Sequence, residues 1–220
     1  MAVVLAVAAG CGVAEAEITI NSIVRETSAT VTWAEDPAYH FTDSRLLDGL
    51  LTPGYGGAVF EVAVDALGGS VTATQQSMVQ TGPESTILSG EFGFRSANDA
   101  GIEPLVLGGS NRMSVAFTAD PAVGWIVPSA SVTGPIVIRV RDAASGIALL
   151  EIDSTLTDGF LTGVLGGSGS YVFEVVASME FDVGLDTTIA SGSASWSLFL
   201  LDGSVDAETV SFGGIKALYR

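Results

Sequence analysis

The segment from Tyr171 to Asp182 alternates between apolar and mostly polar residues, and this pattern constrains the fold more than any other. Residues of one parity are Tyr171, Phe173, Val175, Ala177, Met179 and Phe181, and those between them are Val172, Glu174, Val176, Ser178, Glu180 and Asp182. Successive side chains of a strand point to opposite faces, so the two-residue period predicts a strand with one buried face. The glycines at 166–169 before it are interpreted as a hairpin turn, because no lysine or helix follows as in a phosphate-binding loop.

Short segments rich in β-branched or alternating residues recur along the chain, separated by glycine and proline. They cover residues 17–33, 58–66, 70–80, 85–95, 111–119, 125–132, 135–141, 147–153 and 190–201, with a short strand expected at Thr209–Phe212. No segment keeps apolar residues at helical spacing for more than about three turns. The pattern predicts an all-β fold, namely a two-sheet antiparallel β-sandwich of jelly-roll-like topology.

Two regions are expected to be connections rather than strands. Ala34–Gly57 is rich in turn residues and is predicted to be a long loop, with one short helical turn at Ser44–Leu51. Ser96–Gly109 is predicted to be a loop with one edge strand. The turn Ala144-Ser145-Gly146, between two apolar segments, predicts a β-hairpin.

The N-terminus has the layout of an export signal. Ala2–Ala9 is a short apolar run, and Ala14-Glu15-Ala16 offers the small-x-small pattern of a cleavage site. We therefore expect a signal peptide over residues 1–16, cleavage between Ala16 and Glu17, and a single domain over residues 17–220 in the secreted, cell-surface or periplasmic space. In a second interpretation, Ala8-Ala9-Gly10-Cys11 is a lipobox and Cys11 is lipidated. A third makes Ala2–Val7 an ordinary buried strand.

The charge balance excludes some partners. The chain has 25 acidic and 8 basic residues, for a net charge of −17. Such a surface repels phosphate backbones, so no nucleic-acid partner is expected. No apolar run approaches the ~18 residues that span a bilayer, so no transmembrane span is expected. A cell-surface or matrix polysaccharide remains a candidate partner.

Residues for familiar catalytic or metal sites are scarce. His40 and Cys11 are the only histidine and cysteine, and no Gly-x-Ser-x-Gly motif surrounds a serine. A triad could use only His40, which is predicted to lie in a loop with a packing or surface role, and zinc is not expected. No cofactor is predicted. Acidic loops leave a structural calcium ion open, without assigned ligands.

Glu61 and Glu174 are the best candidates for an acid–base pair, because each lies in a Val-Phe-Glu-Val sequence. Two neighbouring strands could bring their carboxyls to the ~5 Å that a retaining glycosidase needs. Alternation places both on outward faces without adjacent Trp or Tyr, so both are predicted to be non-catalytic. The repeated sequence indicates either duplicated halves or the same turn and strand chemistry used twice.

Aromatic side chains gather around the predicted long connection. They are Trp33, Tyr39, Phe41 and Tyr55. Aromatic rings can bind sugars at the end of a β-sandwich, so these four residues are candidate ligand-binding residues. The alternative interpretation is that they close the end of the core.

The order of segments between Ser70 and Leu200 resembles a known group. Val115–Thr118, Ile136–Asp142, the turn 163–167, Tyr171–Ala177 and the Ser/Ala strand 191–200 resemble exported bacterial β-sandwich proteins of the PEP-CTERM-associated and prepeptidase C-terminal-like kind. The sorting tail of that group, with Pro-Glu-Pro and an apolar span, is not matched at 216–220, so anchoring by that route is not expected. The resemblance implies an export context and a fold.

Together these features predict an exported, non-enzymatic structural or adhesive protein. The alternative is a carbohydrate-binding module or a glycosidase-like protein.

Overall fold

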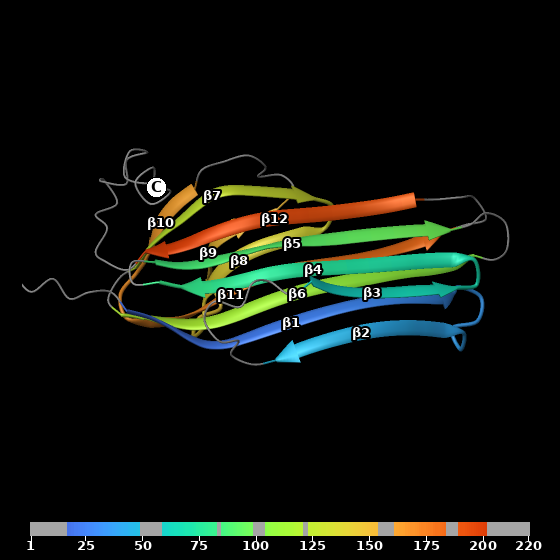
Figure 1. The fold of residues 1–220 in the computed structure, drawn as a ribbon, viewed down its shortest axis with the longest axis horizontal. Coiled ribbons are helices and arrows are strands. Elements are labelled where there is room, and N and C mark those ends of the chain that lie inside the picture. The colour runs from blue at the N-terminus through green and yellow to red at the C-terminus, as the bar shows by residue number, and fades with distance from the viewer. Residues whose placement is uncertain are drawn as a thin grey trace, which may run out of the picture.

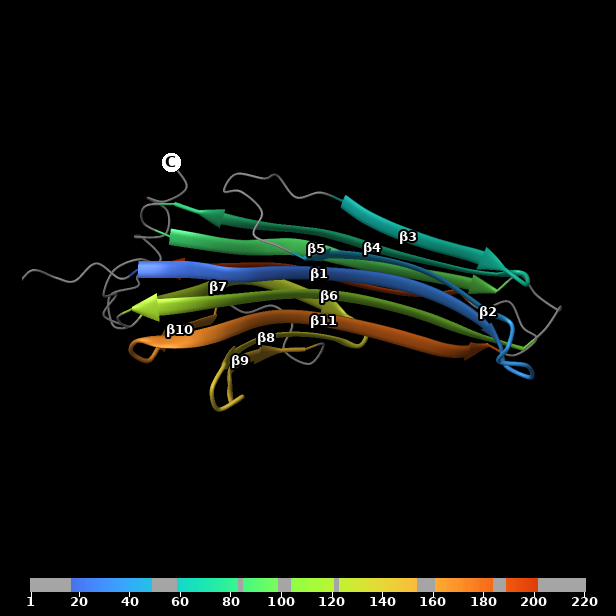
Figure 2. The same ribbon diagram turned by 90° about the horizontal axis from the view of Figure 1, so that it is seen from below.

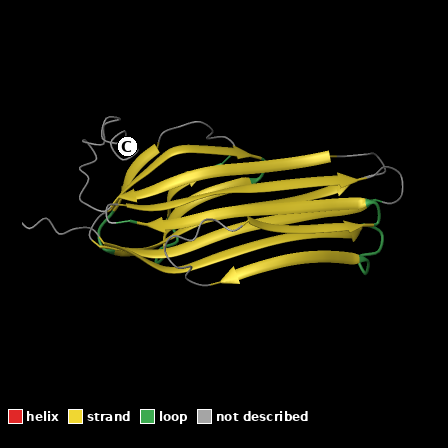
Figure 3. Ribbon diagram, in the orientation of Figure 1, coloured by secondary structure: helices red, strands yellow, loops and turns green. Residues whose placement is uncertain are grey.

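A computed structural model of the protein describes residues 17–48, 59–82, 85–98, 104–120, 123–153, 161–183 and 189–201. These residues form strands and turns and contain no helix, as Figure 3 shows. The strands are β1 (Glu17–Trp33), β2 (His40–Asp48), β3 (Val59–Ala66), β4 (Gly69–Thr81), β5 (Ser85–Asn98), β6 (Leu105–Asp120), β7 (Val123–Thr133), β8 (Ile136–Asp142), β9 (Ala148–Ile152), β10 (Leu161–Leu165), β11 (Gly169–Val183) and β12 (Ile189–Leu201). The all-β prediction is confirmed.

The strands form two sheets of six that pack face to face. The first sheet has the order β2-β1-β6-β11-β8-β9, and the second has the order β10-β7-β12-β5-β4-β3. The strand pairs of both sheets are antiparallel. The two layers are visible in Figures 1 and 2, where long, gently twisted strands run along the longest axis of the molecule. The predicted two-sheet antiparallel β-sandwich is therefore confirmed.

The strand order interlocks segments that are far apart in the chain. β11 lies between β6 and β8, and β12 lies between β5 and β7. Insertion of late strands between earlier ones is a feature shared with a jelly roll, which has eight strands in two sheets. This sandwich has two more strands in each sheet.

The hydrophobic core lies between the sheets and follows the predicted alternation. Phe117 and Phe173 are among its largest fully buried side chains, and they lie on the adjacent strands β6 and β11. On β11, the buried residues of the inner face are Tyr171, Phe173, Val175, Ala177 and Met179. Most strands contribute alternate side chains to this layer, so the core extends along the length of the sandwich, whereas no described side chain of β2 belongs to it.

A few polar groups also cross the core and connect the two sheets. Arg25 Nε of β1 donates a hydrogen bond to Ser77 Oγ of β4 at 2.7 Å. Thr27 Oγ1 donates to Gln75 Oε1 at 3.0 Å, and Asn111 Nδ2 of β6 donates to the Thr74 carbonyl at 3.0 Å. Because buried donors and acceptors are costly when unpaired, these bonds favour one alignment of β1 and β6 over β4.

Several sequence-based expectations about connections are wrong. The segment predicted to hold a helical turn is part of β2 as far as Asp48, and its last three residues, 49–51, lie outside the described residues. β2 is an edge strand that pairs with β1, and His40 is its first residue. Leu105–Gly109, assigned to a loop, belongs to β6, which lies inside its sheet because β1 and β11 pair with both sides. The turn at 166–168 is not a hairpin, because it joins β10 of one sheet to β11 of the other.

Other expectations are confirmed or lie outside the described residues. The hairpin around Ala144-Ser145-Gly146 is present, with β8 and β9 paired antiparallel. Residues 1–16, with Cys11 and Ala16, and the strand expected at Thr209–Phe212 lie outside the described residues. In the part of the chain that the structure describes, there is no helix long and apolar enough to cross a membrane.

Gly90 of β5 permits close packing beneath a buried indole, and its replacement is a test of the core. A Cβ at Gly90 would lie 2.5 Å from the Gln76 carbonyl oxygen and 2.7 Å from Trp196 Cζ2. Neither atom is a flexible chain end, so Gly90→Ala should lower the free energy of unfolding by about 1–3 kcal/mol. Chemical denaturation followed by tryptophan fluorescence measures this change.

Gly93 of the same strand is the matched control for Gly90. A Cβ there would meet Thr74 Oγ1 at 2.6 Å, and this hydroxyl can rotate away. Gly93→Ala should therefore change the unfolding free energy by less than ~1 kcal/mol. Equal effects of the two substitutions would contradict the packing of Trp196 against Gly90.

Candidate functional site

Glu174 lies in the middle of β11 on the outer face of the first sheet. Its neighbours along the strand, Phe173 and Val175, point into the core, so alternation directs the glutamate outward. Yet Glu174 is only 2% exposed. A carboxylate with so little water contact needs partners that replace the lost hydration.

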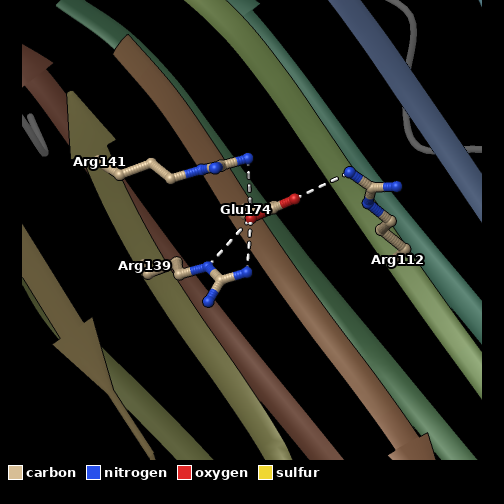
Figure 4. Close-up of polar contacts among 4 residues, drawn as sticks. All are labelled: Arg112, Arg139, Arg141 and Glu174. Atoms are coloured by element: carbon tan, nitrogen blue, oxygen red, sulfur yellow. Dashed lines mark hydrogen bonds and ion pairs between the residues drawn. The ribbon is translucent and has the colours of Figure 1, made fainter. Parts of the chain in front are cut away.

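Three arginines supply those partners (Figure 4). Arg112 Nη2 on β6 lies 2.9 Å from Glu174 Oε1. On β8, Arg139 donates from Nη2 at 2.9 Å and from Nε at 3.0 Å to Oε2, and Arg141 Nη2 lies 3.5 Å from the same oxygen. Both oxygens of the carboxylate are therefore occupied by charge-assisted contacts from the two neighbouring strands.

The strand register explains why these side chains meet. Glu174 is directly opposite Arg139 on β8, and Arg112 and Arg141 are opposite Val176 and Val172, its neighbours along the outer face. Arg112 and Arg141 therefore reach the carboxylate diagonally. The two alternating arginines of β8, at positions 139 and 141, share the outer face because they are two residues apart.

The ion pairs continue a row of alternating charges across five strands. Glu26 of β1 is opposite Arg112 of β6, and Glu151 of β9 is opposite Arg139 of β8. With Glu174 between the two arginines, the row runs negative, positive, negative, positive, negative from β1 to β9. Opposite charges on facing strands stabilise a sheet, and this arrangement balances them locally.

The environment of Glu174 lowers the pKa of its carboxyl group. Burial alone would raise the pKa, but hydrogen bonds from Arg139 and Arg112 and the charges of Arg141 and Arg139 outweigh burial, so the pKa lies below its usual value of 4.5. A general acid at neutral pH needs a raised pKa instead. The group is thus suited to a permanent negative charge in an ion pair.

The structure separates Glu174 from Glu61, its proposed acid–base partner. Glu61 is on β3, an edge strand of the second sheet, whereas β11 belongs to the first sheet. Glu61 is exposed, and its neighbour Val62 points into the core. The two carboxylates therefore lie on opposite outer faces of the sandwich and cannot act on one substrate bond. The two Val-Phe-Glu-Val segments also hold unlike positions, one at a sheet edge and one inside a sheet.

The aromatic candidates are partly brought together. Trp33 and Tyr39 are in contact, with ring centroids 5.5 Å apart and planes at 62°. Tyr39 and Phe41 are 50% and 41% exposed, while Trp33 packs against the core. Trp33 and Tyr39 are therefore not coplanar, as a flat sugar-binding platform would require. Tyr55 lies outside the described residues.

His40 and the candidate metal groups are not assembled into a site. His40 Nδ1 and Thr32 Oγ1 are 2.7 Å apart across the β1–β2 pair, so the ring has a local partner. Within the described ranges, no group of three or more His, Cys, Asp or Glu side chains could hold a metal ion. Glu17, at the predicted cleavage site, is the first residue of β1.

The arginine partners of Glu174 were not predicted from the sequence, although two signals were present. Arg139 and Arg141 alternate with buried residues, which places both on one outer face. Glu174 is flanked on its own face by Val172 and Val176, so apolar side chains lie on both sides of it along the strand. Which strands lie beside β11 depends on the topology, and no local pattern contains that information.

Comparison with known proteins adds no relative. No protein-family model matches the chain, and no curated protein matches it.

Proposed function

We propose that the protein is an exported, non-enzymatic β-sandwich with a structural or adhesive role at the cell surface or in the extracellular matrix. The observation that carries the proposal is the state of Glu174, whose two carboxylate oxygens are held by three arginines. A carboxylate held in this way connects β11 to its two neighbouring strands and so stabilises the sheet. The separation of Glu61 on the opposite outer face and the local hydrogen bond of His40 support the same view.

Export is tested by expressing the full chain in a bacterium and measuring the mass of the protein in each cell fraction. The layout of residues 1–16 leads us to expect a chain that begins at Glu17 outside the cytoplasm. A lipid-modified Cys11 would establish the lipoprotein alternative. A cytoplasmic chain that retains residues 1–16 would contradict export.

The lack of enzymatic activity is tested separately, by incubating the purified protein with a panel of polysaccharides and measuring reducing ends. We expect no release above that of a heat-denatured sample. Release that is abolished by Glu174→Gln, in protein shown to be folded, would contradict the proposal.

A carbohydrate-binding role is the second candidate function. The exposure of Tyr39 and Phe41 at the edge strand β2 favours it, because exposed aromatic rings can stack on sugar rings. The glycosidase form of this alternative has lost its candidate pair, because Glu61 and Glu174 lie on opposite faces.

A further inference from the structure

The outer face of the second sheet contains a polar hollow with a volume of about 360 Å³. It lies where β4, β5 and β12 run side by side, and these strands are neighbours in the sheet. Ligand sites typically occupy about 300–1,000 Å³, so the hollow is large enough for a small ligand or a short stretch of a polymer.

The hollow exists because the outward side chains of these strands differ in size. Ser89, Ser195 and Ser197 are short, whereas Gln76 and Glu91 are longer and lie opposite each other across β4 and β5. Ser195 is the partner of Glu91 on the other side. β12 has serine at each outward position from 191 to 197. These short side chains leave a depression in the outer face between the longer side chains beside them.

The chemistry of the lining suits a neutral ligand rich in hydroxyl groups. Serine hydroxyls donate and accept hydrogen bonds, the Gln76 amide does both, and the Glu91 carboxylate accepts them. The residues that line the hollow include no arginine or lysine, and Glu61 and Asp65 are exposed on the same face of the sheet. Arg95 is exposed on the same face, two outward positions along β5 from Glu91, but it does not line the hollow. An anionic ligand inside the hollow would therefore meet the Glu91 carboxylate and no cation of the lining.

The polar surface continues beyond the hollow. Ser191 and Ser193 extend the outward row of β12, and Ser131 and Thr133 of β7 lie beside that strand. These four residues are exposed. The hydroxyl row favours an extended polymer over an isolated sugar, because several weak contacts can add along one chain.

We propose that this hollow is a binding site for a neutral polysaccharide, with Glu91, Gln76 and the three serines contacting sugar hydroxyls. The inference rests on the adhesive form of the proposed function and adds a ligand class to it. Binding at a single unit is expected to be weak, because the lining offers no exposed aromatic ring, so adhesion depends on repeated contacts along a polymer.

The test measures retention of the protein on insoluble particles of cellulose, chitin and β-1,3-glucan, with an array of neutral and acidic oligosaccharides beside them. We expect retention on at least one neutral polysaccharide and no preference for acidic glycans. Glu91→Ala, which removes an acceptor, and Ser195→Tyr, which fills the hollow, should each weaken retention at least about tenfold. Both positions are exposed, so these variants should fold.

Ala63→Tyr is the matched control, because it adds the same ring at an exposed outward position of β3, outside both the hollow lining and the hydroxyl row, and it should keep most of the retention. Tyr39→Ala tests the other carbohydrate candidate, which is the pair of exposed aromatic residues Tyr39 and Phe41 at the edge strand β2. Retention that is lost in Tyr39→Ala but unchanged in Ser195→Tyr would overturn the inference and support the other carbohydrate site. Lack of retention on every neutral particle, or preference for acidic glycans, would also overturn it. Export and absence of hydrolysis are measured in separate experiments. A negative result in the retention experiment therefore overturns the binding site and leaves the proposed structural role unchanged.

Discussion

Glu174→Gln should lower the free energy of unfolding by about 2–3 kcal/mol at neutral pH. The substitution keeps the shape of the side chain but removes the charge that three arginines share. Breaking a buried pair costs more than this, but the three guanidinium side chains are 37–46% exposed and can partly rehydrate. Urea denaturation of the wild-type protein and the variant measures the difference.

The difference in unfolding free energy between the wild-type protein and Glu174→Gln should depend on pH. The direction of the pKa shift of Glu174 determines how. Because the folded-state pKa of Glu174 is below 4.5, its contribution to stability is complete above about pH 4.5. It is lost as the pH falls through the folded-state pKa. The stability gap between wild type and Glu174→Gln should therefore stay constant above pH 4.5 and narrow below it.

Glu180→Gln is the matched control for this experiment. Glu180 lies on the same strand and the same face, but it is exposed. Its substitution should change the unfolding free energy by less than ~0.5 kcal/mol. A similar cost for Glu174→Gln and Glu180→Gln would show that the arginine contacts add little to the fold.

Phe173→Ala should be the most damaging of the substitutions considered, with a loss of about 3–5 kcal/mol in unfolding free energy. Phe173 is fully buried at the centre of the first sheet, opposite Val115 on β6 and Val140 on β8. Removing the ring leaves a cavity between strands that are held on both sides and cannot easily close it. Thermal and chemical unfolding measure the effect.

Phe173→Leu provides the comparison, because leucine keeps much of the volume and should cost about 1–1.5 kcal/mol. A loss below about 1 kcal/mol for Phe173→Ala would contradict a close-packed core at this position.

The alternation of β11 was predictable because both neighbouring strands bury the same face. Every described side chain from Tyr171 to Met179 that was expected inside is buried. β2 was not predictable in this way. As an edge strand it has polar residues such as Thr42 and Ser44 beside exposed Phe41 and Leu46, so it has no clear buried face and depends on pairing with β1.

The sequence predicted the face of the sheet on which Glu174 lies, but it did not predict which side chains surround the carboxylate. Alternation correctly placed Glu174 on the outer face, yet solvent exposure did not follow, because arginines 35 and 62 residues away in the chain cover it. The same holds for Arg25, which is buried between the sheets beside Ser77 of β4. Both environments depend on which strands become neighbours, and the residues within one strand do not determine that.

The pKa of Glu174 is the most direct test of its structural role. A carbon-13 NMR titration of the glutamate side-chain carboxyls, with Glu174→Gln used to assign the resonance, measures it in the folded protein. We expect a midpoint below 4.5, because the arginine contacts outweigh burial. A midpoint near 6, the range of a catalytic general acid in an apolar pocket, would contradict a carboxylate held permanently charged by three arginines.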